Sequence, residues 1–208
     1  MVQKLGFDKS SYDGRIDWSV AKEKGIQWMT IRASYGLTTD LLYEQESNKA
    51  LGEGIYCVPY HWYVPRKYSP VDQANKFLSV ARCSNMPPML DLEDHLTTRG
   101  YAGIATKELK IWLDTVSQAV GTKPIIYTAR GYVNSYLTND TWLSEYPLMI
   151  ANYEVGFPLI PKPWTPDKMV AWQFRDLADA KYYGFMDAKG CALQLLYKDV
   201  SYEWNLDG

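Results

Sequence analysis

Apolar and polar positions along the chain follow two alternating patterns. Short apolar runs rich in β-branched and aromatic residues predict strands, and the clearest lie at 4–7, 27–33, 54–62, 88–93 and 124–128. Weaker strand-like runs lie at 148–151 and 170–174. Between the runs, apolar residues recur at helical spacing and predict helices at 17–25, 40–51, 69–81 and 106–120. Strand and helix therefore alternate over most of the chain.

Two of the predicted helices have clear end signals. Ser69 is a capping residue followed by Pro70 at the first helical position, and the apolar residues behind them share one face. Asp17 can cap the helix that starts at Trp18, and Gly25 ends it. These signals support the helical assignment at both places.

Strands that alternate with helices form parallel sheets, and about eight such strands close a barrel. A complete barrel of this type takes about 250 residues, so a chain of 208 residues must lack some helices. We expect them to be missing from about residue 153 onward, where prolines are frequent. The alternative is an open doubly wound sheet, but Asp8-Lys9-Ser10-Ser11 replaces the glycine-rich fingerprint of that fold. The prediction is an α/β fold, an irregular TIM-like (β/α) barrel with eight strands and fewer than eight helices.

Composition and charge narrow the choice of partners. The chain is 47% hydrophobic and 22% charged, which is typical of one ordered domain, here residues 1–208 with a tail of uncertain role at 190–208. The formal net charge is −2 and the lysines and arginines form no cluster, so we expect no nucleic-acid partner. No run approaches the ~20 apolar residues that cross a bilayer, and the N-terminus lacks a signal-peptide core. We therefore expect no membrane insertion, and either synthesis in the cytoplasm or a chain trimmed of its signal.

Cysteine and histidine content argues against metal chemistry. Cys57, Cys83 and Cys191 are an odd number of cysteines in a chain of this size, so we expect them to be reduced. His61 and His95 are isolated, and no cysteine pair has zinc-ligand spacing. We expect no metal and no cofactor.

Carboxylates stand where a barrel of this type places its chemistry, at the C-terminal ends of the strands. Asp8 ends the first strand. In the fourth strand, Asp91 and Glu93 are two residues apart, so they face the same side at roughly 6.6–7 Å along the chain. Acids after a strand can simply cap the next helix, but burying two like charges together costs free energy that a function would explain.

A carboxyl pair with a third acid nearby suits glycoside hydrolysis. One protonated acid gives a proton to the leaving oxygen, and another anion stabilises the cationic transition state. Crowding of like charges raises one pKa and keeps that acid protonated near neutral pH. The chain also has 8 Trp and 17 Tyr, which suit a groove for sugars, although interior packing accounts for most of them.

Sequence motifs connect these features to a known family. The segment from Gly6 to Trp18 resembles the first motif of glycoside hydrolase family 25, the lysozymes that include many phage endolysins. Further matches follow in the family's order over about residues 4–187: Ile31-Arg32-Ala33-Ser34-Tyr35-Gly36, Tyr60-His61-Trp62, Gln73-Ala74, Leu90-Asp91-Leu92-Glu93, Pro124-Ile125-Ile126-Tyr127-Thr128, Ile150-Ala151-Asn152-Tyr153 and Ala171-Trp172-Gln173-Phe174. So many motifs in one order make the resemblance specific.

The resemblance implies an N-acetylmuramidase, or lysozyme, on an irregular barrel. Its substrate would be bacterial peptidoglycan, cut at the β-1,4 bond between N-acetylmuramic acid and N-acetylglucosamine. Carried over by position, Glu93 would be the general acid. Asp91 would orient and stabilise the substrate's own 2-acetamido group as it attacks the anomeric carbon, with retention of configuration. Asp8 would support the site electrostatically.

The resemblance also implies substrate-binding residues. The aromatic side chains expected in the groove are Tyr60, Trp62, Tyr127, Tyr153 and Trp172. Asp187 maps to a fourth acidic position on the last strand, but the Asn of the usual Asp-x-Asn setting is missing. The tail from residue 190 has no obvious counterpart in the family, although 191–197 could form one more strand.

Two alternatives from other classes stay open at this point. A catalytically silent glycan-binding module could use the same barrel, but binding alone does not require paired acids. A chitinase-like hydrolase also uses acids two residues apart on strand four, but the motifs at 8–18 and 171–174 favour a lysozyme. We expect a monomer that acts on the bacterial cell wall, released at lysis if it is a phage or prophage endolysin.

Overall fold

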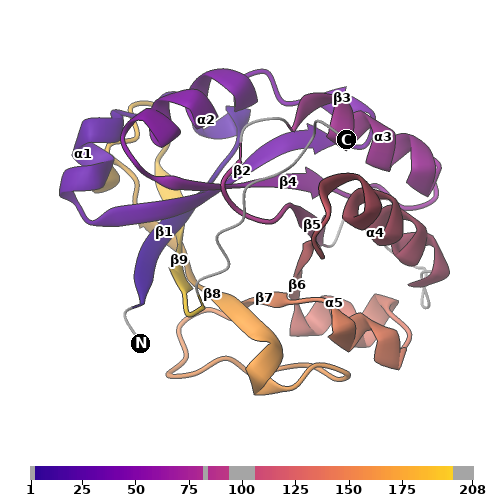
Figure 1. Cartoon of the computed structure of the whole chain (residues 1–208). Helices are drawn as coiled ribbons and strands as arrows, with labels where there is room; N and C mark the ends of the chain where they lie inside the picture. Colours follow the sequence, from indigo (N-terminus) through magenta and orange to yellow (C-terminus); the bar gives the residue numbers. More distant parts are fainter. Residues whose placement is uncertain (1–2, 82–83, 94–105, 199–208) are drawn as a thin grey trace.

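Eight β-strands close into a barrel in the computed structural model, which describes residues 3–81, 84–93 and 106–198 (Figure 1). Around the ring the order is β1, β9, β8, β7, β6, β5, β4 and β2, and β2 pairs back with β1. Neighbouring strands are parallel, except that β9 runs antiparallel to β1 and β8. The strands are β1 (Lys4–Lys9), β2 (Ile26–Tyr35), β4 (Tyr56–Trp62), β5 (Met89–Leu92), β6 (Ile125–Ala129), β7 (Leu148–Ala151), β8 (Met169–Asp179) and β9 (Gly190–Leu196), with a short β3 (Thr38–Thr39) paired to the end of β2.

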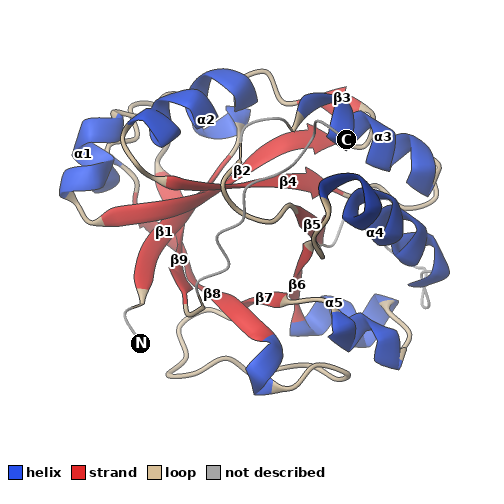
Figure 2. Cartoon of the chain, in the orientation of Figure 1, coloured by secondary structure: helices blue, strands red, loops and turns tan. Residues whose placement is uncertain are grey.

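Five α-helices in the described part of the chain cover only part of the barrel wall (Figure 2). They are α1 (Trp18–Glu23), α2 (Tyr43–Gly52), α3 (Pro70–Val80), α4 (Thr106–Val120) and α5 (Arg130–Tyr136). Short 3-10 helices lie at Ser11–Asp13, Thr141–Glu145, Pro166–Lys168 and Lys181–Tyr183. The predicted barrel of eight strands with fewer than eight helices is confirmed. None of the described helices is long and apolar enough to cross a membrane.

The helices start at the predicted signals. At the start of α1, Asp17 Oδ1 accepts hydrogen bonds from the backbone N–H groups of Ser19 and Val20, both at 3.2 Å. At the start of α3, Ser69 Oγ accepts from the N–H of Asp72 at 3.1 Å. Each cap satisfies backbone donors that have no partner within the helix.

The sequence analysis did not predict α5, which follows β6 directly. Gly131, Val133 and Asn134 all have weak helix propensity, so the composition of this segment does not favour a helix. Tyr132 and Val133 are buried. Tertiary packing rather than propensity therefore stabilises α5, and the helix forms one wall of the site described below.

Alternation of side chains along the strands produces two cores. Inside the barrel the packed residues include Trp28, Val58, Tyr60, Met89, Ile125, Tyr127, Met149 and Ala171. Between the barrel and the helices they include Leu90, Leu92, Ile126, Leu148, Ile150 and Trp172. Because Asp91 is two residues from Met89 on β5, it shares the inward face of the strand. The same alternation directs Tyr127 of β6 inward.

The segment that had no counterpart among the family motifs completes the barrel. The possible strand at 191–197 is β9, which lies between β1 and β8 and pairs with both. Cys57 and Cys191 are buried, and neither forms a disulfide with another described residue. Cys83, His95 and residues 199–208 lie outside the described residues.

Candidate active site

Three carboxyl side chains meet at the C-terminal ends of the barrel strands. Asp8 comes from β1, Asp91 from β5, and Glu93 follows the last residue of β5. All three line one narrow cavity, whose other walls are Thr30, Tyr60, Met89, Tyr127 and Gln173. Because β1, β2, β4 and β5 are parallel, their C-terminal ends share one rim. The structure thus brings together the three acids that the sequence singled out.

Asp91 and Glu93 form a hydrogen-bonded carboxyl pair. Two carboxyl groups can share a hydrogen bond only when one of them carries a proton. Burial raises the pKa of both groups, and for Asp91 the charges of Glu93 and then Asp8 raise it further. Asp91 is only 3% exposed, whereas Glu93 is partly open to the cavity. Both shifts favour retention of a proton by the pair.

Asp8 is positioned by its neighbours on both sides of β1. Burial raises the pKa of Asp8 to about 7, and this effect outweighs the hydrogen bond that Thr30 Oγ1 donates to Asp8 Oδ1 at 2.7 Å. Gln194 of β9 donates through Nε2 to Thr30 Oγ1 at 3.3 Å and to the carbonyl oxygen of Phe7 at 2.9 Å. The buried amide of Gln194 therefore connects β9 to the residue that holds Asp8.

One oxygen of Asp91 is free to accept a hydrogen bond. Asp91 Oδ1 is buried and has no hydrogen-bond partner among the described residues. A buried acceptor without a donor costs roughly 1–3 kcal/mol, which a ligand N–H could recover. Arg32 lowers the pKa of Asp91, but by less than burial and the neighbouring acids raise it. The Arg32 guanidinium itself is held by Asp40, with Nη2 2.8 Å from Asp40 Oδ2.

Gln173 of β8 orients two tyrosines at the edge of the cavity. Its Oε1 accepts hydrogen bonds from the hydroxyl of Tyr127 at 2.8 Å and from that of Tyr153 at 2.7 Å. The Tyr127 hydroxyl is also hydrogen-bonded to Glu93. A phenol has a single proton to donate, so Tyr127 can donate to Gln173 or to Glu93 but not to both at once. The hydrogen bond with Tyr127 lowers the pKa of Glu93, and burial raises it by more.

A wider groove opens beside the narrow cavity. It has a volume of about 640 Å³ and lies between α5 and the segment that follows β7. Glu93 and Tyr127 line both spaces, so the carboxyl pair faces the groove. The other lining residues are mostly aromatic or polar and include Arg130, Tyr132, Ser135, Tyr136, Asn152 and Tyr153. The volume lies within the range of about 300–1,000 Å³ that is typical of ligand sites, and aromatic faces with polar groups suit sugar rings.

The described residues form no evident metal site. No group of three or more His, Cys, Asp or Glu side chains among them could hold a metal ion. The raised pKa values of Asp8, Asp91 and Glu93 also oppose metal binding, because a carboxylate ligand must be deprotonated. The geometry suits acid–base chemistry.

The family model described as glycosyl hydrolases family 25 matches residues 7–181, a range that includes all three acids. This chain belongs to glycosyl hydrolases family 25. The family resemblance noted in the sequence is therefore confirmed. The matched range stops before β9, so the strand that closes the barrel lies outside it.

Relatives in the family are similar over most of this chain. The uncharacterized protein YegX of Escherichia coli (strain K12) is 32% identical over 186 residues, 84% of this chain and 62% of that protein. This chain thus spans less than two thirds of the length of that relative. The N,O-diacetylmuramidase of Chalaropsis sp is 26% identical over 194 residues, 86% of this chain and 90% of that protein. The bacterial lysozyme from Streptomyces coelicolor shares the fold with a TM-score of 0.82 at 19% identity, over 93% of this chain and 92% of that one.

Within this family 25 barrel, the predicted aromatic residues differ in position. Tyr60 and Tyr127 line the narrow cavity, and Tyr153 lines the groove. Trp172 instead packs in the core outside the barrel, and its Nε1 donates to the backbone carbonyl of Asn152 at 2.7 Å. Side chains alternate along β8, so Gln173 faces the barrel interior and Trp172 faces outward. From that outer side, Trp172 supports the segment that carries Tyr153.

Two further predicted residues line neither the cavity nor the groove. Trp62 ends β4 and contacts Tyr35 edge-on, with ring centroids 6.0 Å apart. Asp187 precedes β9 and accepts a hydrogen bond from the backbone N–H of Arg15 at 3.2 Å. β9 contains no acidic residue, and its inward-facing Gln194 contacts Thr30 instead. The structure places Asp187 in a loop contact, away from the fourth acidic position that the family pattern puts on the last strand.

The sequence analysis missed several residues that form the site. Gln173 lies in the motif Ala171-Trp172-Gln173-Phe174. Only the alternation of side chains along the strand shows that Gln173, and not Trp172, faces the barrel interior. Tyr132 and Tyr136 were missed because α5 was missed, although tyrosines four residues apart just after a strand are a helical-face signal. Their rings pack with centroids 5.0 Å apart. Thr30 lies in a buried apolar run, and nothing in the sequence indicates its contact with Asp8.

Proposed function

We propose that this protein is a peptidoglycan hydrolase that cleaves the β-1,4 bond between N-acetylmuramic acid and N-acetylglucosamine. The observation that carries the proposal is the proton-sharing Asp91–Glu93 pair, which faces a groove of suitable size for sugar rings. Two relatives named as muramidase or lysozyme, from Chalaropsis sp and Streptomyces globisporus, support the substrate class. The barrel would act as one catalytic domain and as a monomer, on the bacterial cell wall.

Glu93 would be the general acid. It is the member of the pair that faces the groove, and burial raises its pKa, which favours the protonated form that a general acid needs. As the bond between the anomeric carbon and the leaving oxygen breaks, Glu93 would give its proton to that oxygen. It would then act as a base toward the water that completes hydrolysis.

Asp91 would assist the substrate's own 2-acetamido group. Its unpartnered Oδ1 can accept a hydrogen bond from the acetamido N–H. The acetamido carbonyl oxygen would attack the anomeric carbon and form a cyclic intermediate, which water opens at the same carbon. Two displacements retain the β configuration. Asp8 would add negative charge beside the developing positive charge, once deprotonated.

The arrangement of the pair disfavours an inverting mechanism. An inverting enzyme places its carboxyl groups about 6.5–9.5 Å apart, with a water between acid and base. Asp91 and Glu93 are in hydrogen-bond contact, which leaves no room for that water between them. Proton NMR of the first-formed reducing sugar, recorded before mutarotation, tests the mechanism. We expect the β-anomer of N-acetylmuramic acid, and an initial α-anomer would contradict the role given to Asp91.

Hydrolysis of two substrates tests the two alternative functions, a chitinase-like hydrolase and a silent glycan-binding module. Purified cell walls and chitin are offered in parallel, and the new reducing end is identified after borohydride labelling. We expect labelled N-acetylmuramic acid from walls and no release from chitin. Hydrolysis of chitin would favour a chitinase-like enzyme, and wall binding without a new reducing end would favour a silent binding module.

A further inference from the structure

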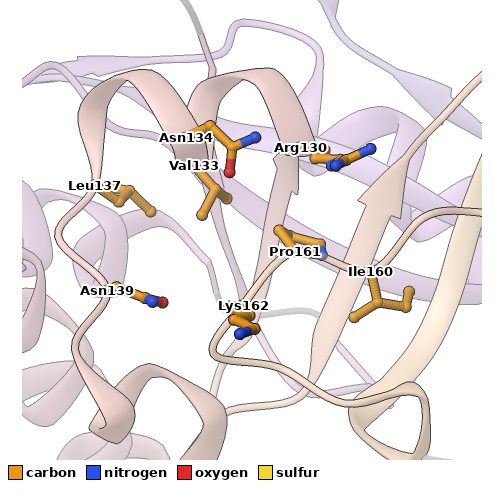
Figure 3. Close-up of a pocket in the computed structure, with 8 residues that line it drawn as sticks. All are labelled: Arg130, Val133, Asn134, Leu137, Asn139, Ile160, Pro161 and Lys162. Carbon is orange, nitrogen blue, oxygen red and sulfur yellow. The ribbon is translucent and has the colours of Figure 1, made fainter.

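A second cavity adjoins the groove on the far side of Arg130. It has a volume of about 590 Å³ and lies between α5 and the segment before β8 (Figure 3). Arg130 lines both spaces, and Leu159 of the groove is the chain neighbour of Ile160 in the second cavity. A substrate chain in the groove could therefore extend a branch past Arg130 into this cavity. Nothing in the proposed cleavage of the glycan requires such a space.

The lining of the second cavity combines an apolar floor with a polar rim. Val133 and Pro161 are buried, and Leu137 and Ile160 are half-buried. The exposed residues on the rim are Arg130, Asn134, Asn139 and Lys162. Figure 3 shows Asn134 on α5 and Lys162 on the segment that faces it. The rim therefore offers amide and cationic donors on both sides of an apolar surface.

The two cations of the rim are available to a ligand. Neither Arg130 nor Lys162 forms an ion pair with any described acid. No Asp or Glu lines the cavity. Arginine in particular binds carboxylates through paired N–H donors. The cavity is thus electropositive, in a chain whose net charge is −2, and its chemistry fits a carboxylate ligand with small apolar groups.

We propose that this cavity binds the stem peptide of the peptidoglycan strand, an inference that rests on the proposed function. The stem peptide branches from the lactyl group of N-acetylmuramic acid, and it carries alanine methyl groups and free carboxylates. The methyl groups match the floor formed by Val133, Leu137 and Pro161, and the carboxylates match Arg130 and Lys162. A phosphate-rich wall polymer would use the cations but not the apolar floor. The cavity therefore selects glycan strands that bear peptides.

A pair of substrates tests the proposal. Wall glycan freed of phosphate polymers is prepared with its stem peptides intact or removed by an amidase, and kcat/KM is measured on each. We expect the intact strands to be preferred about tenfold, as one charge-assisted hydrogen bond would give. Lys162→Glu should abolish the preference and leave activity on stripped strands unchanged. Lys168→Glu is the matched control, because Lys168 is exposed on a nearby 3-10 helix and lines neither cavity.

Three outcomes of the kinetic test would overturn the proposal. They are equal kcat/KM values of the unmodified protein on both substrates, an equal loss on both substrates in Lys162→Glu, and a loss of preference in Lys168→Glu. The last two would indicate a general charge effect.

A binding measurement separates this proposal from the proposed function. Isotope-labelled protein is titrated with N-acetylmuramyl-L-alanyl-D-glutamate, and the side-chain amide signals of Asn134 and Asn139 are followed by NMR. We expect saturable shifts that Lys162→Glu removes. Absence of these shifts would contradict the stem-peptide site even in an active hydrolase. Shifts in a protein that cleaves no wall glycan would support the site and contradict only the proposed reaction.

Discussion

The position of one proton is the central feature of the site at the scale of single residues. Asp91 is more deeply buried than Glu93, yet Glu93 is the group that reaches the groove. Gln173 accepts a hydrogen bond from Tyr127, whose hydroxyl also contacts Glu93 and lowers the pKa of that acid. Burial raises the pKa of Glu93 by more, and so favours the protonated form that a general acid requires.

The first prediction concerns that acid. Glu93→Gln should lower the rate of wall hydrolysis by about 10²–10⁴-fold, because the amide keeps the shape of the side chain but has no acidic proton to give. The thermal unfolding temperature should not fall, since the neutral amide replaces a neutral, protonated acid of nearly the same shape. Glu23→Gln, on the exposed surface of α1, is the matched control and should keep full activity. A Glu93→Gln protein that retained a tenth of the rate or more would contradict the role of Glu93.

The second prediction concerns Asp8 and pH. Its pKa is raised from the ordinary carboxyl value to about 7, so the folded protein binds a proton that the unfolded chain has already released. The stability contributed by this group is therefore complete below pH ~4 and is lost as the pH rises toward 7. Asp8→Asn should remove that loss and raise the unfolding free energy at pH 8 by about 1–3 kcal/mol.

Urea unfolding of the unmodified protein and Asp8→Asn at pH 4 and pH 8 measures this effect. The difference between the two proteins should be small at pH 4 and should appear at pH 8. An equal difference at both pH values would show that Asp8 does not titrate in this window. Activity should fall in the variant at pH 8, where Asp8 is deprotonated and its negative charge near the transition state is lost, and should change little at pH 4.

At the scale of elements, the site is assembled from the ends of strands and from the segments that follow them. β1 and β5 supply the acids, whereas α5 and the segment after β7 supply the groove. The segment after β7 is held to β8 by several hydrogen bonds. One of these contacts is the hydrogen bond from Trp172 Nε1 to the Asn152 carbonyl, made from outside the barrel. Groove shape therefore depends on residues that never touch the substrate.

The third prediction tests this supporting role. Trp172→Phe removes the hydrogen bond to Asn152 and should lower the unfolding free energy by about 0.5–1.5 kcal/mol. Hydrogen exchange should increase in residues 152–159. Trp164→Phe is the matched control, because Trp164 Nε1 donates to the Tyr146 carbonyl at 3.1 Å outside this segment. The control should cost similar stability without faster exchange at 152–159, and equal exchange in the two variants would contradict the role.

Strand and helix positions were largely accessible from the sequence, and the reasons are local. Ser69-Pro70 and Asp17 start helices because capping acts within one turn. Asp91 and Glu93 face one side because alternation is a property of any strand. Trp172 and Asp187 line neither the narrow cavity nor the groove, because a motif match does not show which side of a strand a residue faces or which loop contacts it makes. Gln194 and Thr30 meet across β9, β1 and β2, a contact between residues 164 positions apart that no local pattern encodes.

At the scale of the whole molecule, the barrel closes through β9. This strand pairs with β1 on one side and β8 on the other, so without it both would present open edges.

The fourth prediction is that a chain ending at Lys189 loses cooperative thermal unfolding and native near-UV circular dichroism. Gln194→Leu is the milder comparison, because it keeps the strand and removes only the bonds to Thr30 and Phe7. It should fold but lose activity about tenfold, and native-like behaviour of the shortened chain would contradict the importance of closure.

The closing strand β9 also determines when the site is completed during synthesis of the chain. A ribosome makes β1 first and β9 last among the strands, and Asp8 on the first strand depends on Gln194 on the last. A nascent chain that has emerged as far as Asp187 already carries all three acids, but it lacks the wall that holds Asp8 in place. The site would therefore be incomplete until β9 has been made and has paired with β1 and β8. For an enzyme whose proposed substrate is a cell wall, this order would keep unfinished chains harmless to the cell that makes them.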